Sequence, residues 1–155
     1  MLQCQAHPFA RDKGIEGAKR LGEALLSKGI NLPAVTLGLQ PRPEDFDKVF
    51  VGAASAQAAA AYGSGWSNVP VIRPWPQHTS VTVHEVVSEE LPAEAGRNKA
   101  FPAGYREIAA QLEPGVHWYA LEFSGKQIKR TVLFDGLVYV GDHWAYFPKP
   151  YRVLR

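Results

Sequence analysis

Apolar and polar residues alternate with a period of two over most of the C-terminal third of the chain, which predicts short β-strands. The tight turns Ser124-Gly125, Asp135-Gly136 and Gly141-Asp142 divide this third into strands 116–123, 126–134, 137–140 and 143–147. Asp-Gly, and glycine in the first turn position, are typical of two-residue β-hairpins. The segment 79–87 alternates in the same way. We therefore expect an antiparallel sheet of four or five strands.

Helical spacing is clearest near the N-terminus, where apolar residues recur every three or four positions over 12–29. Asp12 is placed to cap this helix and Gly29 to end it. A second, shorter helix is expected over 103–112. The segment 44–62 is ambiguous, because its pattern fits one helix, or a strand over 48–51 followed by a helix over 55–62.

Two short apolar runs in the N-terminal half, 34–39 and 69–72, predict strands. The main expectation is a single α+β domain spanning 1–155, with N-terminal helices packed on one face of the C-terminal antiparallel sheet. If 49–51 and 69–72 are instead strands around a helix, the N-terminal half contains a small parallel α/β element.

Composition narrows the class of protein. The 155 residues are 46% hydrophobic and 21% charged, which is typical of a soluble globular chain. A net charge of +2 gives no reason to expect nucleic acid or membrane as a partner, and one cysteine excludes an internal disulfide framework. There is no long apolar run, and residues 1–8 do not resemble a signal peptide. We expect a cytoplasmic protein, or alternatively an exported one whose signal has been removed.

Aromatic residues are concentrated at the C-terminal end, where nine of the seventeen lie between Trp118 and Tyr151. Two-residue turns would place Leu121 opposite Ile128, Tyr119 opposite Arg130 and His117 opposite Val132, and paired residues share a face. The face so predicted carries His117, Tyr119, Leu121, Phe123, Ile128, Arg130, Val132, Phe134, Leu137, Tyr139, Trp144 and Tyr146. This face should be the core, and His117 and Arg130 are the polar exceptions on it.

The candidate ligand-binding residues are therefore His117, Tyr119, Arg130 and Trp144, with Arg130 and His117 holding an anionic or polar ligand between aromatic walls. The plain alternative is that Arg130 reaches the sheet edge or pairs with Glu107, while His117 is a core or rim histidine. The favoured function is a non-catalytic binding or accessory protein for a small ligand or a protein partner. The alternative is a small hydrolase, lyase or isomerase with His117, Tyr119 and Arg130 in an open cavity.

The sequence gives little evidence for a metal site, a cofactor or a catalytic motif. The five histidines lack metal-binding spacing, so we expect no metal and no cofactor, and no catalytic residue is assigned. Asp142-His143 lies in a tight turn, where aspartate is expected for conformational reasons. Substrate identity and oligomeric state stay open.

Two resemblances to known families are short. Residues 13–22 resemble the first helix of histidine phosphatases, and 46–51 their next strand, but Ala6-His7-Pro8 stands where the Arg-His-Gly signature would be. The order of helices followed by an antiparallel meander is similar to that of nuclear transport factor 2-like cones, which implies a curved sheet as the floor of a pocket. Neither assigns the chain to a family.

Overall fold

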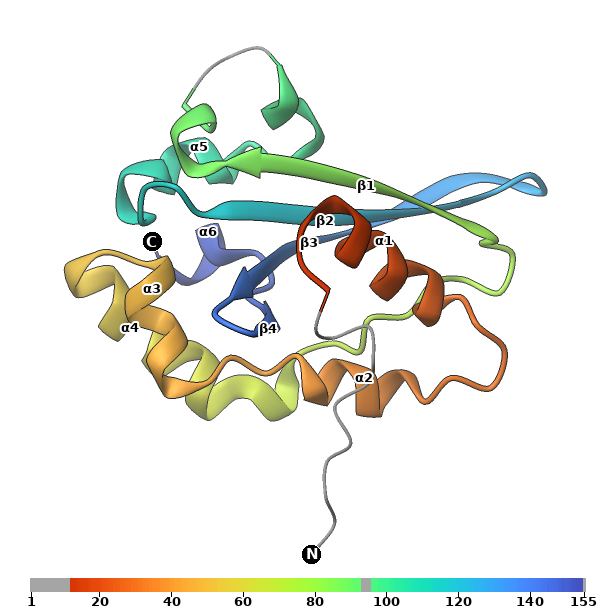
Figure 1. Ribbon diagram of the computed structural model, residues 1–155, viewed down its shortest axis with the longest axis horizontal. Coiled ribbons are helices and arrows are strands. Elements are labelled where there is room, and N and C mark those ends of the chain that lie inside the picture. The colour runs from red at the N-terminus through yellow and green to blue at the C-terminus, as the bar shows by residue number, and fades with distance from the viewer. Residues whose placement is uncertain (1–11, 93–95, 155) are drawn as a thin grey trace, which may run out of the picture.

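A four-stranded antiparallel sheet forms the centre of the molecule, as the computed structural model of residues 12–92 and 96–154 shows (Figure 1). Its strands follow the order β1 (Ser80–Val87), β2 (His117–Gly125), β3 (Ile128–Val140) and β4 (His143–Tyr146). The helices are α1 (Gly14–Leu25), α2 (Leu32–Gly38), α3 (Phe46–Val49), α4 (Gly52–Gly65), α5 (Gly104–Ile108) and α6 (Pro150–Val153). The predicted α+β class is confirmed. Predictions about residues 1–8 lie outside the described residues.

Helices cover the sheet on both faces. α1 and α2 pack on the face that carries Tyr119, Leu121, Phe123, Leu137 and Trp144, which is the predicted core face. The opposite face has a second apolar cluster, formed with α3, α4, α5 and α6, whose sheet residues are Trp118, Ala120, Val138, Val140 and Ala145. The sequence pattern pointed to one covered face. The structure adds the second layer, because the outward positions at this end of the sheet are also apolar and need burial.

A β-bulge stands where a hairpin turn was predicted. β3 continues through Asp135 and Gly136, and its pairing with β2 changes register between Tyr119–Leu137 and Ala120–Asp135. Gly136 is the extra residue, with φ of +100°. The Phe147 amide donates to the Gly136 carbonyl at 2.7 Å, and a Cβ on Gly136 would overlap the Phe147 carbonyl oxygen. A bulge and a tight turn both favour glycine at positive φ, so the Asp-Gly signal does not distinguish them.

The pairing of β2 with β3 corrects three predicted pairs. Leu121 pairs with Phe134 rather than Ile128, and Tyr119 pairs with Leu137 rather than Arg130. His117 lies beyond this ladder and pairs with Val87 of β1, not with Val132. The predicted pairs at the β3–β4 turn, Val140–His143 and Tyr139–Trp144, are confirmed.

Three local predictions in the N-terminal half are wrong. Residues 34–39 fall largely within helix α2, because the Asn31 side chain caps it by accepting from the Ala34 amide at 3.0 Å. Residues 69–72 form no strand, and the Ile72 amide donates to the Thr36 hydroxyl at 3.0 Å. Asp12 does not cap α1, whose N-cap is Lys13.

The ambiguous segment 44–62 combines parts of both alternatives. A 3₁₀ turn, Pro43–Asp45, leads into α3, and α4 follows after a single bridge between Phe50 and Leu112. That bridge is antiparallel, so the described residues contain no small parallel α/β element.

We predict that Gly136→Ala lowers the free energy of unfolding by at least about 2 kcal/mol, since it combines strain at positive φ with overlap on a backbone oxygen. Gly63→Ala is the matched control, because Gly63 lies in α4 with open space around it and alanine favours a helix. Urea unfolding of both variants measures the difference. Equal stabilities would show that the bulge does not require glycine.

Candidate functional site

A pocket of about 570 Å³ lies at the end of the sheet opposite the β2–β3 hairpin tip. Its floor is built by side chains of three adjacent strands, Glu85 from β1, His117 and Tyr119 from β2, and Tyr139 from β3. Lys13 and Gly14 at the start of α1 line it, as do Lys48 of α3 and Gly141 of the β3–β4 turn. The pocket therefore joins five segments that are separate in the sequence.

Strand register explains why these floor residues share a face. Glu85 pairs with Tyr119, and Tyr119 pairs with Leu137. Tyr139 and His117 lie two residues away from members of these pairs, and alternate residues of a strand point to the same side. Only the extra residue Gly136 keeps Tyr139 on this side, because one additional position reverses the alternation beyond it.

Two lysines give the pocket its electrostatic character. Neither Lys13 nor Lys48 forms an ion pair within the described part of the chain. The Lys48 Nζ atom lies 3.8 Å from the position that a Cβ on Gly141 would take. The acidic lining residue is Glu85, whose Oε2 lies 3.5 Å from Nδ1 of His117. The pocket lining thus includes two lysines and one glutamate, and the glutamate carboxylate lies next to an imidazole.

The structure brings together three of the four predicted site residues. His117 and Tyr119 line the pocket, and the His117 side chain is 53% exposed. Trp144 is buried behind them, with its ring edge-on to Tyr119 at 5.2 Å and to Tyr139 at 5.3 Å between centroids. Its Nε1 donates to the Asp12 carbonyl at 2.7 Å, just before α1 begins. Trp144 therefore supports the aromatic floor from behind.

Arg130 lies elsewhere, near the tip of the β2–β3 hairpin. Phe123 pairs with Val132 at that end of the sheet, six residues from His117 along β2, which corresponds to roughly 20 Å. The guanidinium of Arg130 is exposed and lies over the Trp75 ring, 5.7 Å from its centroid. No residue of the pocket lining comes from this hairpin tip, and no ion pair between Arg130 and Glu107 is found among the described residues.

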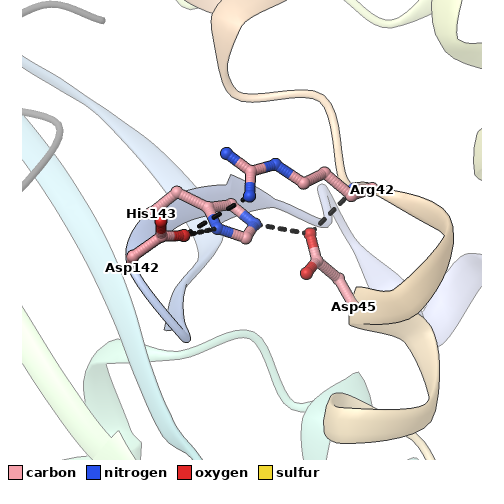
Figure 2. Close-up of polar contacts among 4 residues, drawn as sticks. All are labelled: Arg42, Asp45, Asp142 and His143. Carbon is pink, nitrogen blue, oxygen red and sulfur yellow. Dashed lines mark hydrogen bonds and ion pairs between the residues drawn. The ribbon is translucent and has the colours of Figure 1, made fainter.

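A polar cluster on the β3–β4 turn borders the pocket (Figure 2). The ring of His143 lies between two carboxylates, with Nε2 at 2.7 Å from Oδ2 of Asp45 and Nδ1 at 2.9 Å from Oδ1 of Asp142. Arg42 donates to both acids, from its amide to Asp45 at 2.8 Å and from Nη1 to Asp142 at 3.3 Å. An imidazole that donates from both nitrogens is the protonated, cationic form.

The two carboxylates of this cluster differ in their surroundings. Asp45 is completely buried, and its Oδ1 has no hydrogen-bond partner. The Asp142 side chain is 84% exposed. The hydrogen bond from His143, and to a smaller extent the nearby Arg42, lower the pKa of Asp142. While it is protonated, His143 provides a positive charge next to the buried Asp45 carboxylate.

A third polar group, Asp135, is buried on the other face of the sheet. Tyr105 donates to its Oδ2 at 2.6 Å. Burial raises the pKa of Asp135, although the Tyr105 hydrogen bond acts in the opposite direction. Burial likewise raises the pKa of the Tyr62, Tyr105 and Tyr146 hydroxyls. Asp135 does not line the pocket, and we assign this buried pair to the support of the bulge.

Sequence patterns could not reveal several of these residues. Lys13, Lys48 and Glu85 meet only because α1 and α3 pack beside the sheet. The sequence predicts a turn at Asp142-His143. It does not show that His143 contacts Asp45, which lies 98 positions earlier. The sequence indicates only that Asp45 lies at the start of a helical segment, because proline followed by acidic residues, as at Pro43, is typical of a helix start.

Compared with known proteins, the chain matches no family model, no curated protein and no solved structure. None of the described helices is long and apolar enough to cross a membrane. Within 12–92 and 96–154, no three His, Cys, Asp or Glu side chains gather as a metal site would require. The pocket and the cluster beside it are therefore the features of the molecule that bear on its function.

Asp135→Asn should change how stability depends on pH. A carboxyl whose pKa is raised in the folded state stabilises the fold while protonated, so wild-type stability should fall relative to Asp135→Asn as pH rises from about 3.9 through the raised pKa. Asparagine keeps an acceptor for Tyr105. Urea unfolding across this pH range tests the sign, and a constant difference between the two proteins would contradict it.

Removing the cation from Asp45 should be costly. We predict that His143→Gln lowers the free energy of unfolding by about 3 kcal/mol at neutral pH, because it leaves a buried carboxylate without its charged partner. Asp142→Asn breaks the exposed half of the same cluster and should leave the urea midpoint close to that of wild type. Similar losses in both variants would show that burial of Asp45 is not the cause.

Proposed function

We propose that the protein binds a small anionic ligand in the pocket between α1, α3 and the sheet. The observation that carries this proposal is the meeting of Lys13 and Lys48 at one pocket, with no ion pair to either lysine among the described residues. The two lysines outnumber the single acidic residue of the lining, Glu85, so a bound anion would be attracted to the pocket. His117 adds a nearby imidazole that can donate a hydrogen bond or become a further cation.

The start of α1 supports the same ligand charge. Gly14 lies at the pocket, and no side chain caps this end of the helix. The free N–H groups of a first helical turn favour negative charge. This contribution is secondary, since it adds to the lysines and could not define a site without them.

Pocket size and lining indicate a ligand with an apolar or aromatic part. A volume of about 570 Å³ is within the range of small-molecule sites. Tyr119 and Tyr139 present their rings between the polar groups, and Trp144 fixes both rings from behind. A small carboxylate or phosphate ester with a planar or aliphatic body combines these features.

A protein partner is supported less well. Such a role would be favoured by an exposed apolar patch that includes tryptophans, but Trp66 and Trp118 are buried, and Trp75 stacks on His78. Among the described residues, the large apolar side chains with high exposure are Ile15 and Leu37, and these two do not provide a patch of the size that partner surfaces usually show.

An enzyme is the second candidate, favoured by the position of Glu85 beside Nδ1 of His117. A carboxylate on this side can orient the ring, so that Nε2 is presented as a general base or acid. Lys48 would take the anion-holding role first considered for Arg130. His117→Gln distinguishes the two functions, because it should abolish turnover of a substrate while a ligand still binds the lysines.

The binding proposal predicts a thermal shift that depends on Lys48. At about ten times its Kd, an anion that binds only the folded protein should raise Tm by roughly 3–6 °C. Sulfate, citrate and aromatic carboxylates are suitable first probes. Lys48→Met should lose most of the shift, because it keeps the aliphatic stem but removes the charge.

Lys126→Met is the matched control, since Lys126 is exposed in the β2–β3 turn at the far end of the sheet. It should respond as the wild type does. Equal responses of both variants, or no response of the wild type to any anion, would contradict the proposal.

A further inference from the structure

The β3–β4 turn connects the pocket to the polar cluster of Figure 2. Gly141 lines the pocket, with the Lys48 Nζ atom 3.8 Å from its Cβ position. The next residue, Asp142, lies in the cluster and bonds to His143 and Arg42. The Asp142 carboxylate is thus held by His143 and Arg42 one residue along the chain from Gly141, which the Lys48 ammonium group approaches. Asp142 and Lys48 form no ion pair in this arrangement.

Because the Asp142 side chain is exposed, it can change its conformation once its contacts with His143 and Arg42 are broken. Its side chain is 84% exposed, and its contact with Arg42 is long, at 3.3 Å, between two exposed side chains. Exposed pairs of this kind contribute little free energy. The 2.9 Å hydrogen bond from Nδ1 of His143 is the shorter restraint.

Loss of a proton from His143 would break this outer bond rather than the inner one. A neutral imidazole has one N–H group, so it can donate to only one of its two carboxylates. Asp45 is buried and cannot replace His143 with water, whereas Asp142 can turn to solvent. The remaining proton is therefore needed on Nε2, facing Asp45, and Nδ1 then presents a lone pair to Asp142.

We propose that Asp142 is a proton-controlled competitor for the anion site: His143, while protonated, holds its carboxylate away, and deprotonation of His143 releases it to pair with Lys48. The pairing of Asp142 with Lys48 does not depend on the proposed function. Only its consequence rests on that function, namely that the anionic ligand binds less tightly once Lys48 is paired. The charged groups that face His143 among the described residues are Asp45 and Asp142, with Arg42 on both acids. Lys48 is the further cation at the turn.

The first test needs no ligand. NMR follows the His143 ring and the Lys48 side-chain resonances, the latter identified with Lys48→Met, from about pH 5 to 9, the range in which imidazoles usually titrate. In the wild type, the Lys48 resonance should shift together with the titration of His143. In Asp142→Asn it should stay constant, because the carboxylate that His143 controls is absent. Glu107→Gln, which removes an exposed charge from α5, should behave as the wild type.

The second test measures binding of sulfate, whose charge does not change in this range. Wild-type affinity should fall with rising pH, and any contribution of other pocket residues to this fall is shared by Asp142→Asn. The variant should therefore bind sulfate about two- to fivefold more tightly than wild type at the alkaline end, the span that an exposed ion pair usually gives. At the acidic end the two proteins should differ less.

The outcomes separate the competitor from the proposed function. If Lys48 follows His143 but sulfate binds neither protein, the anion site fails while the competitor is supported. If sulfate binds in a Lys48-dependent way but the Lys48 resonance ignores His143, or His143 does not titrate in this range, the competitor is overturned. Because His143→Gln could unfold, Arg42→Gln is the second variant: it removes one side-chain partner of Asp142 and leaves His143 in place, so the Lys48 resonance should still shift together with the titration of His143.

Discussion

The extra residue in β3 is the constraint on which the pocket depends. Gly136 changes the alternation of the strand, so Phe134 and Leu137 face the same side, and so does Tyr139 two residues later. Without it, Tyr139 would point into the opposite cluster and the pocket would lose part of its floor. The bulge is stabilised from two directions: Tyr105 donates to the Asp135 carboxylate, and the Phe147 amide donates to the Gly136 carbonyl. A backbone irregularity therefore determines where the polar and aromatic groups of the site can meet.

Sequence reasoning succeeded where local periodicity was sufficient. Alternation found the strands and the core face, including Tyr119 and Trp144, even though Asp135-Gly136 was taken for a turn. A two-residue turn and a one-residue bulge both put the residues on either side of them, 134 and 137, on the same face, so the assignment of faces held while the topology was wrong. The same reasoning failed for 34–39, where the cap from Asn31 outweighs an apolar pattern that resembles a strand. Apolar runs of this length fit either structure.

Only part of the candidate site could be predicted from local sequence patterns. His117 and Tyr119 were found because they are spaced by two on one strand. Lys13 and Lys48 were not, since their proximity follows from how α1 and α3 pack beside the sheet. Arg130 shows the converse: the turn between β2 and β3 lies at residues 126–127 rather than at the predicted Ser124-Gly125, so Arg130 lies near the hairpin tip and not opposite Tyr119. Charge pairs between distant segments, such as Asp45 with His143, have no local signature at all. The free-energy cost of leaving such a buried charge without its partner is large enough to fix the position of the chain around it.

The position of Trp144 also affects the fluorescence of the protein. Its indole is buried and in edge contact with both tyrosines of the pocket floor, and it is bonded to the backbone just before α1. Tyrosine transfers excitation to tryptophan over such short distances, and indole emission responds to changes in nearby rings and hydrogen bonds. A molecule that enters the pocket and shifts Tyr119 or Tyr139 must disturb this arrangement from the other side. The fold thus contains an optical reporter of its own pocket, which needs no label and is never itself exposed to the ligand.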